Sequence, residues 1–184
     1  MAVEKTLEEV LKENDLTEAN LSPLVSREYT PSSKVNYVPP GPRNQKTPEQ
    51  RVNEASPFEK EILAYLKERG INHEFERPLV VKEGEEIHVR LPDFYLPDRN
   101  LFIELNGMEG DPEQDKRYEE KNRNYDKNGI KYVVIHKDEM KSGKWKEKLE
   151  GILGKSEPKA SPSGSSVPVY AGIATCLLTL LYLL

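Results

Sequence analysis

The sequence predicts a mixed α/β domain over residues 56–153, with its elements in the order α-β-β-β-α-β-α. Two observations support this prediction. Helical patterns with capping signals alternate with short strand-like runs, and the apolar runs LFIEL (101–105) and KYVVIH (131–136) flank one long polar helix. A β-α-β connection of this kind makes the two strands parallel neighbours with a right-handed crossover.

The first half of the domain begins with a helix. The sequence Ser-Pro-Phe-Glu at 56–59 supplies an N-cap, a proline at the first helical position and a capping-box glutamate, so the helix is expected to run to about Arg69 and stop at Gly70. Two strand-like segments follow at 73–82 and 86–96. Each contains a proline, which is typical of an edge strand or a bulge.

The second half alternates turns, strands and helices. Glycine and proline mark the boundaries of these elements, and the apolar runs are expected to be buried strands. In order, we expect a turn at 97–100, a strand at 101–105, a helix at 112–128, a strand at 130–136 and a helix at 144–153.

Both ends of the chain differ in composition from this domain. Residues 1–55 are rich in proline and polar residues, which predicts a mostly disordered leader with one short helix near residues 7–11. The leader is either a docking segment for a protein partner or a passive extension. Residues 154–166, rich in serine and proline, are expected to form a flexible linker.

The last 18 residues, 167–184, form the only membrane candidate in the sequence. Fourteen of them are apolar and none is charged. A helix of this length rises about 27 Å, close to the thickness of the hydrocarbon core. We expect a single-pass transmembrane tail anchor, with Lys155 and Lys159 keeping the preceding domain in the cytoplasm. The alternative is an apolar helix packed on the domain or on a partner.

Charge and cysteine content exclude some classes of protein. The formal net charge of −5 argues against a protein that coats DNA generally. A single cysteine, Cys176, excludes an intramolecular disulfide and a cysteine-rich zinc site.

Two carboxylates stand out because they interrupt apolar strands. Asp93 follows Pro92 within the segment 86–96, and Glu104 lies inside LFIEL. A hairpin through residues 97–100 brings the two strands side by side, so both carboxylates are expected near one edge. Carboxylates this close repel each other unless a cation lies between them, and oxygen ligands suit Mg²⁺ or Mn²⁺.

Two further charged residues lie on the apolar faces of their helices. Glu59 falls within the apolar stripe of the first helix, where it either faces the metal or simply completes the capping box with Ser56. Lys121 is spaced three and four residues from Tyr118 and Tyr125, on the stripe expected to face the sheet. Its ammonium either acts beside the two carboxylates or extends to solvent while its stem covers the tyrosine rings.

The segment 91–135 (LPDFYLPDRNLFIELNGMEGDPEQDKRYEEKNRNYDKNGIKYVVI) resembles the PD-(D/E)XK nuclease superfamily. The similar branch carries PDFYLP, then IE-x-x-GMEGDP, then a helix with EK-x-x-x-Y. The resemblance implies a restriction-endonuclease-like αβββαβ core with a mixed central sheet and Mg²⁺-dependent hydrolysis of DNA. It also implies that Asp93 and Glu104 bind the metal together with the carbonyl of Leu105, and that Glu59 is the acidic residue of the first helix.

One position departs from the family pattern. The residue two after Glu104 is Asn106, where the family has lysine, and a neutral amide cannot supply the charge of an ammonium. In relatives the lysine can move to the following helix, and Lys121 matches that position. The resulting expectation is a membrane-tethered, Mg²⁺-dependent DNA endonuclease with Asp93, Glu104, Lys121 and Glu59 at its catalytic site. The alternative is an inactive module that binds nucleic acid or serves as a membrane adaptor.

Basic residues on the helix at 112–128 are candidates for contacts with the phosphates of DNA. Residues 112–149 contain 11 basic and 8 acidic residues, a local excess of three positive charges in an acidic protein. A homodimer is also compatible with the resemblance. The candidate DNA-binding residues are Lys116, Arg117, Arg123 and Lys127.

Overall fold

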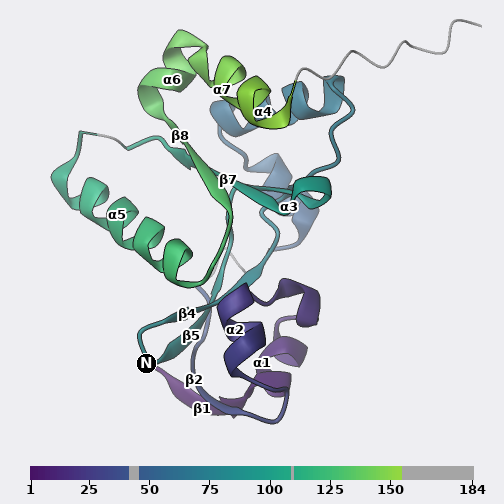
Figure 1. The fold of residues 1–184 in the computed structure, drawn as a ribbon, viewed down its shortest axis with the longest axis vertical. Coiled ribbons are helices and arrows are strands. Elements are labelled where there is room, and N and C mark those ends of the chain that lie inside the picture. The colour runs from purple at the N-terminus through teal and green to yellow at the C-terminus, as the bar shows by residue number, and fades with distance from the viewer. Residues whose placement is uncertain (42–45, 109, 155–184) are drawn as a thin grey trace, which may run out of the picture.

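The computed structural model describes residues 1–41, 46–108 and 110–154 and has a mixed α/β fold with two four-stranded mixed sheets (Figure 1). The helices are α1 (Leu7–Glu13), α2 (Pro23–Glu28), α3 (Pro48–Asn53), α4 (Pro57–Glu68), α5 (Pro112–Lys127), α6 (Lys137–Ser142) and α7 (Lys144–Leu153). The strands are β1 (Val3–Thr6), β2 (Lys34–Val38), β3 (Glu74–Phe75), β4 (Leu79–Glu83), β5 (Glu86–Arg90), β6 (Phe94–Leu96), β7 (Leu101–Asn106) and β8 (Tyr132–His136).

The second sheet has the order β3-β6-β7-β8, and we call it the site sheet because Asp93 directly precedes β6 and Glu104 lies in β7. Strands β6 and β7 pair antiparallel across a short 3₁₀ turn at Pro97–Arg99, and β7 pairs parallel with β8 after the α5 crossover. The predicted hairpin and the predicted β-α-β unit are therefore both confirmed.

Alternation along β7 divides its side chains between two environments, because successive residues of a strand point to opposite faces. Leu101 and Ile103 lie in a core with α4, α6 and α7, where Trp145 is completely buried. Phe102 lies on the other side, in a cluster with Tyr125 of α5. Glu104 shares the parity of Phe102, so the strand directs this carboxylate towards α5.

Helix α5 lies on the face of the sheet opposite α4, α6 and α7 (Figure 1). The N-cap Asp111 accepts hydrogen bonds from the backbone N–H groups of Glu113 and Gln114, so the helix begins where the sequence predicts. Tyr125 contacts the apolar cluster that contains Leu79 and Val81 of β4. Strand β4, which belongs to the sheet β1-β2-β5-β4, thus packs against α5.

Residues 1–41 do not form the mostly disordered leader that was expected. They fold into β1, α1, α2 and β2, with a 3₁₀ turn at Glu18–Asn20, and they extend the β4-β5 hairpin into the sheet β1-β2-β5-β4. Leu7, Val10 and Tyr37 are almost fully buried in a core completed by Val80 and Ile87 of the hairpin. The segment is too polar to bury a core of its own, and it folds because the hairpin supplies the other half.

The two long strands expected from the sequence are each divided. Glu76 interrupts the first between β3 and β4, with a left-handed φ of +48° and its N–H donating to the carbonyl of Asp93 at 2.9 Å. The second expected strand, 86–96, is divided into β5 and β6 by residues 91–93, which include Pro92. The short helices α3 and α6 were not expected.

Across residues 1–41, 46–108 and 110–154, the structure contains no helix with the length and hydropathy needed to cross a membrane. The predicted transmembrane segment 167–184 lies outside the described residues, as does the predicted linker beyond Gly154.

Candidate functional site

Asp93 and Glu104 meet on the side of the site sheet that faces α5. Asp93 immediately precedes β6, and its Oδ2 accepts a hydrogen bond from the backbone N–H of Leu105 at 2.6 Å. Because Leu105 follows Glu104 on β7, this bond fixes one carboxylate next to the strand that carries the other. The sequence prediction that the hairpin would bring the two residues together agrees with this geometry.

Glu104 is only 1% exposed, and both of its oxygens accept hydrogen bonds from α5. The Tyr125 hydroxyl donates to Oε1 at 2.5 Å, and the Lys121 ammonium donates to Oε2 at 2.5 Å. A buried carboxylate requires such partners, since an unpaired charge in the interior is costly.

The spacing of α5 places Tyr118, Lys121 and Tyr125 on one face, as the sequence predicts. Lys121 lies between Tyr118 and Tyr125, with its Nζ 5.9 Å and 5.7 Å from the centroids of the two rings. The Tyr118 hydroxyl donates to the carbonyl of Leu105 at 2.9 Å. The Lys121 ammonium therefore forms an ion pair with Glu104 while it lies near both tyrosine rings.

Burial and mutual repulsion shift the protonation of the site. Burial, and then the negative charge of Glu104, raise the pKa of Asp93 well above its usual range, while Lys121 opposes this rise. Burial lowers the pKa of Lys121, but the attraction of Glu104 and Asp93 outweighs it and the net pKa is raised. The site therefore holds a permanent cation beside a carboxyl group that is reluctant to ionise.

The sequence leaves two arrangements open for Glu59, facing the metal or completing the capping box with Ser56, and the structure contains the capping box. Its side chain accepts a hydrogen bond from the N–H of Ser56 at 2.5 Å, while the Ser56 hydroxyl accepts from the N–H of Glu59. Glu59 is 8% exposed, and its charge makes a minor contribution to the raised pKa of Asp93. It thus lies near the carboxylate pair while serving the end of α4.

The donor set at the site fits a hard divalent cation. Asp93 and Glu104 supply carboxylate oxygens and Leu105 a carbonyl oxygen, which are the ligands that Mg²⁺ and Mn²⁺ prefer. Each oxygen that accepts a bond here has a second lone pair. No group of three or more His, Cys, Asp or Glu residues suited to a metal occurs in the part of the chain that the structure describes.

A pocket of about 360 Å³ opens beside the carboxylate pair. It lies between one face of α5 and the hairpin formed by β4 and β5, and Tyr118 and Lys121 belong to its wall. Arg90 forms a two-point ion pair with Glu83 at 2.7 Å and 2.5 Å on the hairpin side. Lys121 therefore connects the pocket with Glu104.

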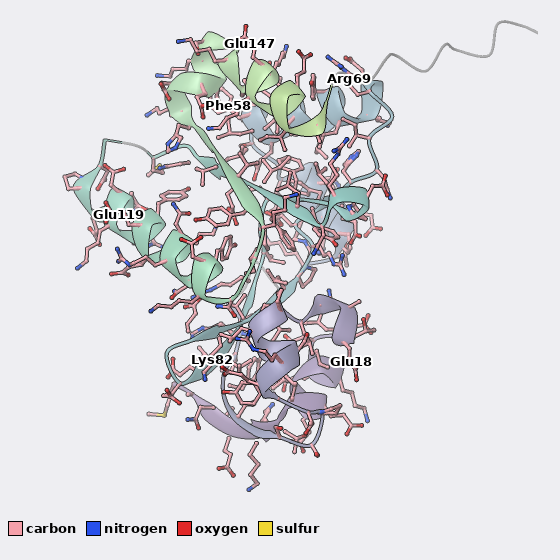
Figure 2. The ribbon with its side chains drawn as sticks, in the orientation of Figure 1. Glu18, Phe58, Arg69, Lys82, Glu119 and Glu147 are labelled. Carbon is pink, nitrogen blue, oxygen red and sulfur yellow. The ribbon has the colours of Figure 1, made fainter. Side chains whose placement is uncertain are left out.

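The predicted DNA-binding residues divide between two sides of α5. Arg117 lines the pocket, where its guanidinium is 3.3 Å from the Gln114 side-chain oxygen. Arg123 forms an ion pair with Glu119 at 3.7 Å, on a part of the helix surface remote from the sheet (Figure 2). Lys116 and Lys127 are exposed.

Asn106, the residue in the family's lysine position, is buried, and its side-chain oxygen accepts a bond from the N–H of Met108 at 3.3 Å. It shapes the loop after β7 and supplies no charge to the site.

Sequence reasoning missed the hydroxyl donors of Tyr118 and Tyr125. It also missed the ion pair between Glu83 and Arg90 on the β4-β5 hairpin. The spacing of Tyr118 and Tyr125 with Lys121 was the available signal for the hydroxyls, but it indicated only packing. The contribution of Glu83 and Arg90 to the pocket had no local signal, because the hairpin reaches α5 only through the tertiary fold.

Comparisons with protein-family models, with curated proteins and with solved structures find no match.

Proposed function

We propose that this chain is a metal-dependent endonuclease that hydrolyses DNA phosphodiester bonds. The observation that carries the proposal is the convergence of Asp93, Glu104 and Lys121, two carboxylates and an ammonium, of which Lys121 also lines a pocket. Carboxylates with a neighbouring cation are suited to bind a divalent metal and to stabilise the charge that develops on a phosphate.

The order of elements supports the same proposal. With β3 and β4 taken as one divided strand, and β5 and β6 as another, the chain reads α4, three antiparallel strands, α5 and the parallel strand β8. This is the order of the restriction-endonuclease-like αβββαβ core, and we propose that fold for residues 56–153.

Each residue has a definite role in this proposal. A bound Mg²⁺ supplies an acidified water and shields the charge of the phosphate. Asp93, Glu104 and the Leu105 carbonyl hold the ion. Lys121 orients the attacking water and offsets negative charge, while Tyr125 fixes Glu104 and Tyr118 fixes the carbonyl of Leu105.

The test is cleavage of supercoiled, linear, single-stranded and branched DNA in Mg²⁺, Mn²⁺ or EDTA. The wild-type chain is expected to cut only with metal, and Asp93→Ala and Glu104→Ala to abolish cutting. Lys121→Ala should reduce turnover more than DNA binding. Glu119→Ala is the matched control, because Glu119 lies 70% exposed on α5.

Calorimetric titration with Mn²⁺ separates this proposal from the inactive binding module. Metal binding by the wild-type chain that is lost in Glu104→Ala supports the nuclease. A chain that binds no metal and cuts none of the DNA forms contradicts it, as does a Glu104→Ala variant that cuts at the wild-type rate.

We further propose that residues 167–184 anchor the chain in a membrane. Their apolar composition supports this proposal. The full chain should float with phosphatidylcholine vesicles on a density gradient, and a chain ending at Gly154 should not. Equal flotation of both chains would contradict the anchor.

A further inference from the structure

The pocket beside Lys121 has walls of mixed chemistry. Along α5 it is lined by the amides of Gln114 and Asn124 and by the ring of Tyr118, and Leu91 contributes an apolar wall. The two amides lie ten residues apart on one helix, about 15 Å along its axis, so they line opposite ends of the α5 wall of the pocket. An amide carries both donors and an acceptor, which matches the mixed edge of a nucleobase.

The charges of the pocket are largely neutralised by existing partners. Arg90 is held by Glu83, and Lys121 by Glu104, so these two cations are already compensated. Arg117 contributes a further cation, with Glu120 in the same wall. An environment of this kind favours a neutral polar ring over a second phosphate, which would require a concentration of uncompensated positive charge.

The volume of the pocket limits what can enter it. Its volume of about 360 Å³ is near the lower end of the range for small-ligand sites, about 300–1,000 Å³. A base fits such a space, but a duplex, in which the base stays stacked and paired inside a helix far wider than the pocket, does not. A base can enter only if it is unpaired or has been rotated out of the duplex.

We propose that this pocket receives a single unpaired nucleobase next to the phosphate at Glu104, so that the substrate class is DNA with unpaired nucleotides. The inference rests on the proposed function, which sets the phosphate at Glu104. Glu104 is outside the pocket wall, and Lys121, which lines the pocket and bonds Glu104, is the link between the two. Asn124, which lies one turn from Lys121 on α5, binds the base edge, and Tyr118 contributes an aromatic surface.

Binding is measured in EDTA, where cleavage is absent, by fluorescence anisotropy. The probes are a labelled 20-nucleotide single strand, a strand of the same length made entirely of abasic nucleotides, and a blunt hairpin duplex. Asn124→Ala should weaken binding of the intact strand about 3- to 10-fold, the range for one lost hydrogen bond. The abasic strand should bind to the wild type at least as weakly as the intact strand binds to Asn124→Ala, because no base is left to enter the pocket.

Asn122→Ala is the matched control, because Asn122 lies on α5 outside the pocket wall. It should bind all three probes like the wild type. Asn124→Ala should also leave binding of the hairpin duplex unchanged, which distinguishes a base site from a general phosphate contact.

Cleavage distinguishes failure of this inference from failure of the proposed function. Metal-dependent cutting with equal binding of intact and abasic strands overturns the base pocket and leaves the nuclease intact. Absence of cutting, with base-dependent binding that Asn124→Ala removes, overturns the nuclease and supports the pocket. If the wild type cuts, cutting of a bubble substrate should fall in Asn124→Ala while cutting of continuous duplex does not.

Discussion

Glu104 is held in the interior by a hydroxyl and an ammonium from the same helix. The two donors lie four residues apart on α5, so a single helix face satisfies both oxygens of the carboxylate. Each donor removes part of the cost of burying the charge. The two bonds thereby fix the position of the Glu104 side chain.

Tyr125→Phe tests this positioning. The variant removes the hydroxyl that donates to Glu104 Oε1 and leaves the buried ring in place. Loss of such an outer partner typically costs about 10- to 100-fold in metal affinity or activity. We expect a weaker Mn²⁺ affinity by calorimetry and a higher Mg²⁺ requirement for cleavage.

Tyr132→Phe is the control for that substitution, since Tyr132 packs against Tyr125 with ring centroids 5.3 Å apart and its hydroxyl does not reach Glu104. An equal effect of both substitutions would contradict a specific role of the bond between the Tyr125 hydroxyl and Glu104.

Asp93→Asn is expected to stabilise the fold while abolishing cleavage. The raised pKa of Asp93 means that the folded state favours the protonated carboxyl, so this residue contributes stability at low pH that is lost as pH rises through the folded pKa. Asparagine does not ionise and avoids that loss. Urea denaturation in EDTA should show a gain of about 0.5–2 kcal/mol at pH 7.

The advantage of Asp93→Asn over the wild type should shrink as the pH is lowered towards 4, where the unfolded carboxyl is also protonated. A variant that is less stable than the wild type by the same amount at every pH would contradict this account.

The carboxyl end of α5 is joined to the N-terminal part of the chain through Asn128. This residue is completely buried, accepts bonds from Ser22 Oγ at 2.8 Å and Lys82 N at 2.9 Å, and donates to the carbonyl of Lys82 at 2.8 Å. Lys82 itself lies beside α2 and bonds Glu28 through its ammonium (Figure 2). One amide thus joins α5, β4 and the segment before α2.

Asn128→Ala should therefore destabilise the whole fold. It leaves buried polar groups of β4 and Ser22 without their partner, at a cost of about 1–3 kcal/mol for each group left unsatisfied. Urea denaturation monitored by circular dichroism measures the loss. Asn53→Ala, at the exposed end of α3, should change stability by less than about 0.5 kcal/mol. Equal stability of Asn128→Ala and the wild type would contradict the joining role.

Local sequence patterns predicted α4 and β7 better than they predicted β3 to β6 and the elements of residues 1–41. The capping sequence at 56–59 and the apolar strand at 101–105 determine their own structure, so α4 and β7 match the prediction closely. Glu104 and Lys121 could be selected because each is charged where its element is otherwise apolar or aromatic.

The division of the strands and the folding of residues 1–41 depend on distant partners. Glu76 leaves the extended region where its N–H meets Asp93, and Tyr37 is buried only because β2 pairs with β5. Windows of local sequence do not contain these pairings, and proline-rich composition predicted disorder instead.

At the scale of the molecule, the folded unit is larger than the 56–153 domain expected from the sequence. Residues 1–41 cover Val80 and Ile87, both of which are at most 1% exposed in the complete fold. Their removal would expose an apolar surface and one edge of the β4-β5 hairpin.

Two truncations test this extent. A chain that begins at residue 46 should aggregate or melt at a clearly lower temperature, because it lacks half of one core. A chain that ends at Gly154 should retain the melting temperature of the full chain in detergent. The readout is thermal unfolding by circular dichroism, and a chain beginning at residue 46 that melts like the full chain would contradict the larger unit.

Strand β4 lies between two apolar cores, with Val80 in the one built by α1 and α2 and with Leu79 and Val81 in the one beneath α5. Because both cores contain side chains of β4, unfolding of one core removes part of the other. The described chain should consequently unfold in a single calorimetric transition whose van't Hoff and calorimetric enthalpies agree, as for one cooperative unit. Segments that are distant in sequence thus share one melting event, which links the order of the first forty residues directly to the order of the site.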